Sequence, residues 1–304
     1  MNPILAVGSV AFDTIRNPFG EASRVVGGSA TYFSIAASFF TEVRLVAVVG
    51  EDFADRGSHL FAGRSVDLTG LQTLPGETFR WKGEYGFDLN TRETIYTKLN
   101  VFEQFHPVIQ EEHRSSPIVF LGNIHPQLQL EVLDQVVAPR LVAADTMNLW
   151  IENTLDELLE VLKRVDVLII NDSEARELSR EANLVKAARV IRAMGPSTVV
   201  IKRGEHGVLM TRSDGDFFAA PAMPLEEVFD PTGAGDTFAG GFVGSLAACP
   251  EPDDAAMARA IIYGSTIASF TVEDFGLDRL LTLTEDEVKE RFRCFKRLTF
   301  FEED

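Results

Sequence analysis

Short, nearly continuous apolar runs dominate the hydrophobic pattern of the chain. Runs of β-branched and aliphatic residues are typical of strands buried on both faces of a sheet. They occupy residues 4–8, 43–50, 117–122, 140–145, 165–172 and 197–204, with helix-length segments between them at 29–40, 126–138 and 153–165. This alternation predicts a three-layer α/β/α fold with a largely parallel central sheet. Ligands are then expected at the carboxyl ends of the strands.

Residues 76–102 break this rhythm. The segment has no long apolar run, but it places Phe79, Trp81 and Tyr85 on one side of a turn-rich centre, with a second β-rich run after it. This pattern predicts an antiparallel pair with one apolar face, which would form a small β lid beside the main sheet. Residues 13–26 are candidates to join it. With no linker in the sequence, residues 1–304 are interpreted as a single domain.

Composition narrows the class of protein and its partners. The chain has 304 residues, 45% of them hydrophobic, and a net charge of −18, which opposes binding to nucleic acid or to an anionic membrane surface. Two cysteines, Cys249 and Cys294, cannot form a disulfide framework. Without a signal peptide or a long apolar span, a cytoplasmic protein is expected, as a monomer or a homodimer.

The stretch "DPTGAGDTFAGGF", residues 230–242, carries the strongest chemical signal. A helix that begins near Ala234 would place Gly233, Gly235 and Asp236 at its first turn, where unpaired N–H groups and the helix dipole favour an anion. Asp236 is expected to stay ionised there and to accept a proton from a hydroxyl that attacks a bound phosphoryl group. The alternative is that Asp236 only stabilises the start of the helix.

Two common phosphate-binding motifs are absent. No G-x-x-x-x-G-K-[ST] occurs, and Phe238 stands where the third glycine of G-x-G-x-x-G would follow Gly233 and Gly235. The loop therefore belongs neither to a P-loop nor to a dinucleotide-binding fingerprint.

The stretch resembles the C-terminal signature of the ribokinase-like (PfkB) carbohydrate and nucleoside kinases. Further segments resemble other motifs of that family, namely "VGSVAFD" (7–13), "GGSA" (27–30), "NDSE" (171–174) and "KRGEHG" (202–207). The resemblance thus extends along nearly the whole chain. It implies ATP as phosphoryl donor, Mg²⁺, in some members a monovalent cation such as K⁺, and a lid at residues 76–102.

The resemblance also implies roles for individual residues. It assigns Asp236 as the base with Gly233, Ala234 and Gly235 as the anion hole, Asn171, Lys202, Gly204, Gly207 and Thr232 as nucleotide contacts, Glu174 as the metal neighbour, and Asp13, Gly27 and Gly28 as substrate contacts.

Each assignment has a simpler structural alternative. Asp13 could accept hydrogen bonds from sugar hydroxyls, or it could only stabilise a turn. Gly27 and Gly28 could bring backbone close to the substrate, or act as a loop hinge. Asn171 and Glu174 could hold a hydrated Mg²⁺, but the same pair also fits a helix cap.

Two departures from the family pattern leave the substrate open. Tyr32 stands where the family often has a substrate-binding asparagine, and "DTMNLW" has Asp145 and Asn148 without the arginine of the fructokinase-like D-x-N-x-R. Asp145 and Asn148 stay candidate substrate contacts. Asn123 and His125 follow a predicted strand and are two more.

The sequence therefore predicts a kinase that transfers the γ-phosphoryl group of ATP to a primary hydroxyl of a small sugar. A nucleoside is the alternative acceptor, because Tyr32, Trp81 and Tyr85 favour a ligand with a flat face. An alternative of another class is a catalytically silent binding module. The retained base argues against that alternative, since a binder does not need one.

Overall fold

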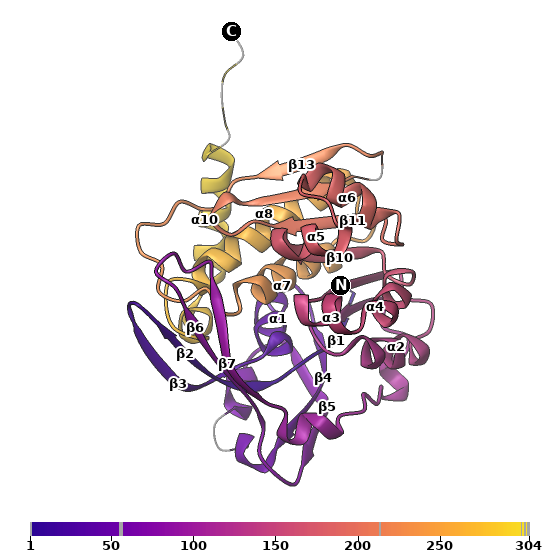
Figure 1. Cartoon of the computed structure of the whole chain (residues 1–304), viewed down its shortest axis with the longest axis vertical. Helices are drawn as coiled ribbons and strands as arrows, with labels where there is room; N and C mark the ends of the chain where they lie inside the picture. Colours follow the sequence, from indigo (N-terminus) through magenta and orange to yellow (C-terminus); the bar gives the residue numbers. More distant parts are fainter. Residues whose placement is uncertain (1, 55–56, 213, 299, 301, 303–304) are drawn as a thin grey trace.

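The computed structural model describes residues 2–54, 57–212, 214–298, 300 and 302. Its centre is a nine-stranded sheet in the order β13-β12-β11-β10-β9-β8-β1-β4-β5 (Figure 1). The strands are β1 (Ile4–Val7), β4 (Val43–Gly50), β5 (Val66–Leu74), β8 (Ile118–Leu121), β9 (Leu141–Asp145), β10 (Val167–Asn171), β11 (Thr198–Lys202), β12 (Val208–Thr211) and β13 (Phe217–Ala220). From β5 to β11 all neighbours are parallel, whereas β12 and β13 add antiparallel. The predicted fold class is confirmed.

The apolar runs are buried on both faces, as predicted. In β1, Leu5 and Val7 pack into one core cluster and Ile4 and Ala6 into another on the opposite face. Three strands escaped the sequence pattern for a physical reason. Strand β5 lies at the edge of the sheet and is mostly half-buried, so its residues are not uniformly apolar. Strands β12 and β13 have four residues each, which is too short for a long apolar run.

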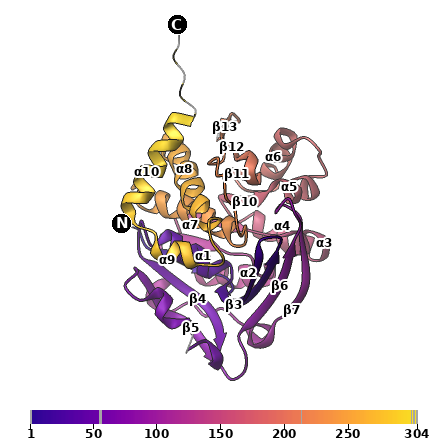
Figure 2. The same cartoon turned by 90° about the vertical axis from the view of Figure 1, so that its left-hand side faces the viewer.

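Helices cover both faces of the sheet (Figure 2). On one face lie α1 (Ser29–Ala37), α7 (Ala234–Ala247), α8 (Asp254–Thr271), α9 (Asp278–Thr282) and α10 (Glu285–Leu298). On the other lie α2 (Pro126–Gln135), α3 (Asn148–Asn153), α4 (Leu155–Leu162), α5 (Asp172–Ser179) and α6 (Leu184–Arg192). Short 3₁₀ helices occupy Glu51–Phe53, Ser58–Phe61, Asn100–Gln104, Glu111–His113 and Gly204–His206. None of the helices in the described ranges has the length and apolar character needed to cross a bilayer.

A second sheet of four strands forms the small β lid. Its order is β3-β2-β6-β7, with β2 (Ala11–Asn17), β3 (Gly20–Gly27), β6 (Phe79–Tyr85) and β7 (Arg92–Lys98). Strands β6 and β7 are the antiparallel pair expected within residues 76–102, and β2 joins β6 in parallel. The lid is therefore built from two hairpins that are distant in the sequence.

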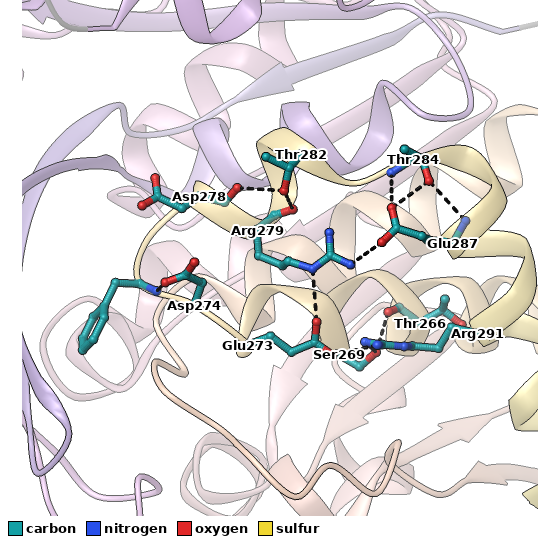
Figure 3. A network of polar contacts seen from close by, with 11 residues as sticks. Thr266, Ser269, Glu273, Asp274, Asp278, Arg279, Thr282, Thr284, Glu287 and Arg291 are labelled. Atoms are coloured by element: carbon teal, nitrogen blue, oxygen red, sulfur yellow. Dashed lines mark hydrogen bonds and ion pairs between the residues drawn. The ribbon is translucent and has the colours of Figure 1, made fainter.

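The C-terminal helices are tied together by ion pairs (Figure 3). Glu273, just after α8, accepts from Arg279 at 3.2 Å and pairs with Arg291 of α10 at 2.7 Å. Arg279 also pairs with Glu287 at 2.6 Å, and Glu287 in turn caps α10 through Thr284. The segment after α8 is thus held in place by two arginines from different elements.

Candidate active site

The start of α7 is an open anion site. Gly233 is the N-cap residue, with a left-handed φ of 76°, and no side chain caps the helix. Ala234, Gly235 and Asp236 follow in the first turn, where backbone N–H groups lack intrahelical acceptors. The N–H of Ala234 donates to Pro231 O at 3.2 Å, just before the helix. Glycine is required at position 233, because a β-carbon there would lie 2.4 Å from the Tyr32 ring. The turn therefore has a backbone that could bind an anion, and the anion-hole role of Gly233, Ala234 and Gly235 stays a prediction.

Asp230 holds the turn in position, a role that the sequence reasoning missed. Its fully buried carboxylate accepts the N–H of Thr232 at 2.9 Å and that of Gly276 at 3.1 Å. The backbone N–H of Phe229 bonds to Val272 O at 2.8 Å. The position of Asp230 at the head of the "DPTG" motif was the only sequence signal for this role. The phosphate-binding turn is thereby fixed to the segment after α8.

A cluster of charged side chains surrounds the turn at the carboxyl ends of the strands. Lys202 ends β11, and its Nζ lies 3.4 Å from Oδ2 of Asp145, which ends β9. A β-carbon at Gly235 would lie 2.9 Å from the same Nζ, so the ammonium group is next to the helix start. Burial disfavours a charged lysine, yet the carboxylates of Asp145, Glu174 and Asp236 raise the pKa of Lys202. Lys202 therefore stays protonated beside the anion site.

Asp236 differs from the expectation that it is firmly ionised. Burial, reinforced by the charge of Asp145, raises its pKa to about 7, although Lys202 and Arg92 act in the opposite direction. The N–H groups of one helix turn do not offset the loss of water and the nearby carboxylate. A carboxyl group with a pKa near 7 suits a general base at neutral pH, because it can both accept and release a proton.

Asn171 and Glu174 form the helix cap that the sequence analysis gave as their alternative role. Asn171 Oδ1 accepts the N–H of Glu174 at 2.8 Å, and Glu174 Oε2 accepts the N–H of Asn171 at 2.9 Å, which completes a capping box on α5. Burial and the charge of Asp145 raise the pKa of Glu174 to about 7. The cap thus holds a buried carboxyl group whose pKa also responds to the charges of Asp145 and Lys202.

The donor set around Glu174 fits a hydrated Mg²⁺. No group of three metal-ligating His, Cys, Asp or Glu side chains occurs among the described residues, so a fully protein-ligated metal has no site there. Mg²⁺ usually keeps several waters and takes only one or two carboxylates. Glu174 and Asp145 are two such carboxylates, and burial raises the pKa of each even though the charge of Lys202 acts in the opposite direction.

The acceptor side of the site is formed by the lid and the start of α1. Asp13 of β2 is buried, and burial together with Asp230 and Asp236 raises its pKa to about 7, although the Gly28 N–H donates to it. A β-carbon at Gly27 would lie 1.9 Å from Asp13 Oδ2, and one at Gly28 would lie 2.5 Å from Ser9 O. Both glycines therefore allow close approach to Asp13 and Ser9, which a simple hinge would not require.

Tyr32 contributes a polar group that is unsatisfied within the protein. The residue is 1% exposed, and its hydroxyl has no hydrogen-bond partner among the residues that the structure describes. Burial and the neighbouring charge of Asp13 raise the pKa of Tyr32 well above its ordinary value, so the hydroxyl stays protonated. An unpaired buried hydroxyl costs about 1–3 kcal/mol, which a ligand hydroxyl can recover.

Other predicted contacts are engaged in local structure. Asn123 Oδ1 accepts from the Trp150 indole at 2.8 Å. His125 is the N-cap of α2, accepts from the N–H of Gln127 at 3.1 Å, and packs edge-on against Trp150. Asn148 is the first residue of α3. These contacts tie the three residues to local structure, and none of them joins a residue to the cluster around Asp236.

The glycine turn after β11 also has a structural basis. Gly204 opens a short 3₁₀ helix with a φ of 54°. Gly207 has a φ of 81°, and a β-carbon there would lie 2.0 Å from Ala220 O. Both positions require glycine for the backbone alone, so nucleotide contacts at Gly204 and Gly207 stay predictions.

The lid is closed onto the phosphate-binding turn. Thr232 Oγ1 donates to the Tyr85 hydroxyl at 3.0 Å, and Tyr85 is 9% exposed. Trp81, the other lid aromatic, has the Arg92 guanidinium 5.4 Å above its ring. Sequence reasoning did not single out Arg92, because an arginine in a turn-rich polar segment gives no pattern of its own.

Comparison with known proteins agrees with this geometry. The model of the pfkB family carbohydrate kinases matches residues 1–282. The chain belongs to this family. It is 32% identical over 250 residues to a cytidine kinase of Thermococcus kodakarensis, covering 80% of this chain and 88% of that one. It is 34% identical over 301 residues to an inositol 3-kinase of Arabidopsis thaliana, covering 95% and 80%.

A solved structure shows the same fold. A putative ribokinase II of E. coli, determined in complex with ATP and Mg²⁺, superposes with a TM-score of 0.80 at 19% identity, covering 97% of this chain and all of that one. As a PfkB member, the chain is an ATP-dependent kinase of carbohydrate or nucleoside acceptors. The predicted enzyme class is confirmed.

Proposed function

We propose that this PfkB kinase transfers the γ-phosphoryl group of ATP to the primary hydroxyl of a ribonucleoside. The observation that carries the proposal is the placement of two buried polar groups beside the start of α7. They are the Asp13 carboxyl group and the Tyr32 hydroxyl, which has no hydrogen-bond partner among the described residues. Two such groups recognise the hydroxyls of a ribose or another polyol. Similarity to the Thermococcus cytidine kinase favours a nucleoside over the free sugar that the sequence analysis placed first.

The arrangement divides the chemistry among few groups. Asp236 accepts the proton of the attacking hydroxyl, and the backbone N–H groups of Gly233 to Gly235 stabilise the charge on the transferred group. Lys202 supplies a fixed positive charge next to them. Mg²⁺, which Glu174 and Asp145 would hold through water, neutralises phosphate charge when bound. The closed lid excludes water from the transfer.

An inositol-like polyol is the second candidate, and one observation favours it. The aromatic side chains thought to accept a flat base are already engaged, since Tyr32 packs on Gly233, Tyr85 bonds to Thr232 and Trp81 lies under Arg92. The polar groups that remain suit a ring bearing several hydroxyls. The plant inositol 3-kinase is similar over nearly the whole chain.

A screen of acceptors tests the proposal. ADP release by the purified protein, with ATP and Mg²⁺, is measured against pyrimidine and purine nucleosides, inositol, pentoses, hexoses and sugar acids. We expect turnover with one or more ribonucleosides. Turnover with inositol or a free sugar alone would contradict the nucleoside assignment, and no turnover would favour the silent binding module. The K⁺ dependence, the cellular location and the oligomeric state stay predictions.

A further inference from the structure

The lid carries an arginine that none of the sequence motifs includes. Arg92 is the first residue of β7 and lies opposite Tyr85 in the antiparallel register with β6. Tyr85 is the residue whose hydroxyl bonds to Thr232 in the phosphate-binding turn. Arg92 therefore belongs to the part of the lid that meets this turn.

Neighbouring lid residues support the side chain of Arg92. The Trp81 indole lies along the strand across Gly83, where a β-carbon would come within 2.0 Å of the ring. Its Nε1 donates to Thr94 Oγ1 at 3.3 Å, and the Arg92 Cζ lies 5.4 Å from the ring centroid. A guanidinium above an indole is a favourable cation–π arrangement. Arg92 also makes a side-chain hydrogen bond to Tyr85, and the further N–H donors of the guanidinium can take another partner.

The charge of Arg92 reaches both halves of the site. Burial raises the pKa values of Asp13 and Asp236, and the positive charge of Arg92 opposes this rise at both. Lys202, the other cation acting on Asp236, is already paired with Asp145 at 3.4 Å. Arg92 has no carboxylate within ion-pair distance among the residues that the structure describes. It is a cation facing the site without a fixed anionic partner.

The bound phosphates would supply that partner. Phosphoryl transfer depends on positive groups around the transferred oxygens, and arginine matches their geometry with two parallel hydrogen bonds. Lys202 is already paired with a carboxylate, so a second cation delivered from the lid side would add positive charge for the phosphates.

We propose that Arg92 is a catalytic lid residue that contacts the transferred phosphoryl group. The inference rests on the proposed kinase function. As the bond between the γ-phosphorus and the β,γ-bridging oxygen breaks, the acceptor oxygen bonds to phosphorus, its proton passes to Asp236, and ADP leaves. Arg92 stabilises the charge on the phosphoryl oxygens. Because Arg92 is part of the lid, closure of the lid also brings its positive charge to the transferred group.

Nucleotide binding tests this assignment without any acceptor. Calorimetry compares Mg²⁺·ADP with Mg²⁺·AMP-PNP, an ATP analogue with nitrogen at the β,γ bridge, for the full-length parent and for Arg92→Gln. We expect the variant to lose about 10-fold or more in affinity for AMP-PNP and little for ADP, the usual scale for a lost charge-assisted contact. Lys98→Gln, an equal charge change on the same exposed strand, is the control and should bind both nucleotides like the parent. Equal losses for the two nucleotides in Arg92→Gln, or no loss, would overturn the proposal.

Kinetics with the acceptor found in the screen provide the second readout. Arg92→Gln should lower kcat about 10- to 100-fold with little change in acceptor KM, and Arg92→Lys should recover part of the loss. The acidic limb of the pH profile should also move to higher pH, because the charge that lowers the pKa of Asp236 is gone. A change confined to acceptor KM would overturn the assignment. If the screen finds no acceptor, the proposed function fails while the binding comparison still decides the role of Arg92.

Discussion

Tyr32 and Gly233 are in such close contact that a β-carbon on Gly233 would lie 2.4 Å from the tyrosine ring. The residue that departs from the family signature therefore supports the backbone turn that binds phosphate. Its hydroxyl is buried without a hydrogen-bond partner and lies near Asp13. One side chain thus connects the acceptor subsite with the anion hole.

Tyr32→Phe should separate these two roles. The ring still packs on Gly233, and the loss of an unpaired hydroxyl should leave the free energy of unfolding unchanged or raise it. We expect kcat/KM for the acceptor to fall about 10- to 100-fold. The parent should use poorly the deoxy analogue that lacks the hydroxyl bound by Tyr32. Tyr32→Phe should use this analogue and the complete acceptor equally well. Lower stability with unchanged kcat/KM would show a purely structural tyrosine.

Asp236→Asn tests the base. An amide of the same shape cannot accept the proton, so kcat should fall by at least about 100-fold, the scale of a lost general base. The affinity for ADP, measured by calorimetry, should change little. Turnover at the parental rate would return Asp236 to the role of stabilising the start of α7.

Stability and activity should change in opposite directions with pH. Asp13, Glu174 and Asp236 have folded pKa values of about 7, above the ordinary 3.8 to 4.5. Between the ordinary pKa values and about 7, the folded state therefore binds more protons than the unfolded state does. The contribution of these groups to the free energy of unfolding is fully present below about pH 4 and is lost as the pH rises through about 7. Each unit of raised pKa costs about 1.4 kcal/mol once the group is ionised.

The measurement is a series of melting temperatures of the ligand-free protein from pH 5 to 8, beside kcat over the same range. We expect melting temperature to fall and kcat to rise as Asp236 ionises. Asp236→Asn should flatten the stability curve in part. A melting temperature that rises from pH 5 to 8 would contradict the burial of these ionisable groups.

Glu174→Gln separates the metal role from the helix cap. Glutamine also completes a capping box, so the cap on α5 should survive and the melting temperature at pH 8 should not fall. A neutral amide holds hydrated Mg²⁺ less well than a carboxylate does. The Mg²⁺ concentration for half-maximal activity should therefore increase several-fold. An unchanged Mg²⁺ titration would leave Glu174 with the cap alone.

Local pattern was sufficient for the fold because the central strands are buried on both faces and so are uniformly apolar. It failed for β5, which is half-buried at the edge of the sheet, and for β12 and β13, which are too short to give a long apolar run. In the site, Asp236 could be predicted because its neighbours form one contiguous stretch. The role of Asp230 depends on a hydrogen bond from Gly276, which is distant in the sequence. The position of Arg92 depends on how its side chain packs on Trp81, which the sequence pattern does not show.

The ion pairs at the C-terminus imply that the working enzyme is longer than the region that defines its family. The shared region stops at residue 282, whereas α10 begins at Glu285. Yet Arg291 of α10 forms an ion pair with Glu273, and both residues are seen in Figure 3. The carbonyl of the adjacent Val272 accepts the backbone N–H of Phe229, just before Asp230. An expression boundary drawn after residue 282 would keep every catalytic residue but remove a brace of the phosphate-binding turn. Helix α10 belongs inside any minimal catalytic fragment or chimaera made from this chain.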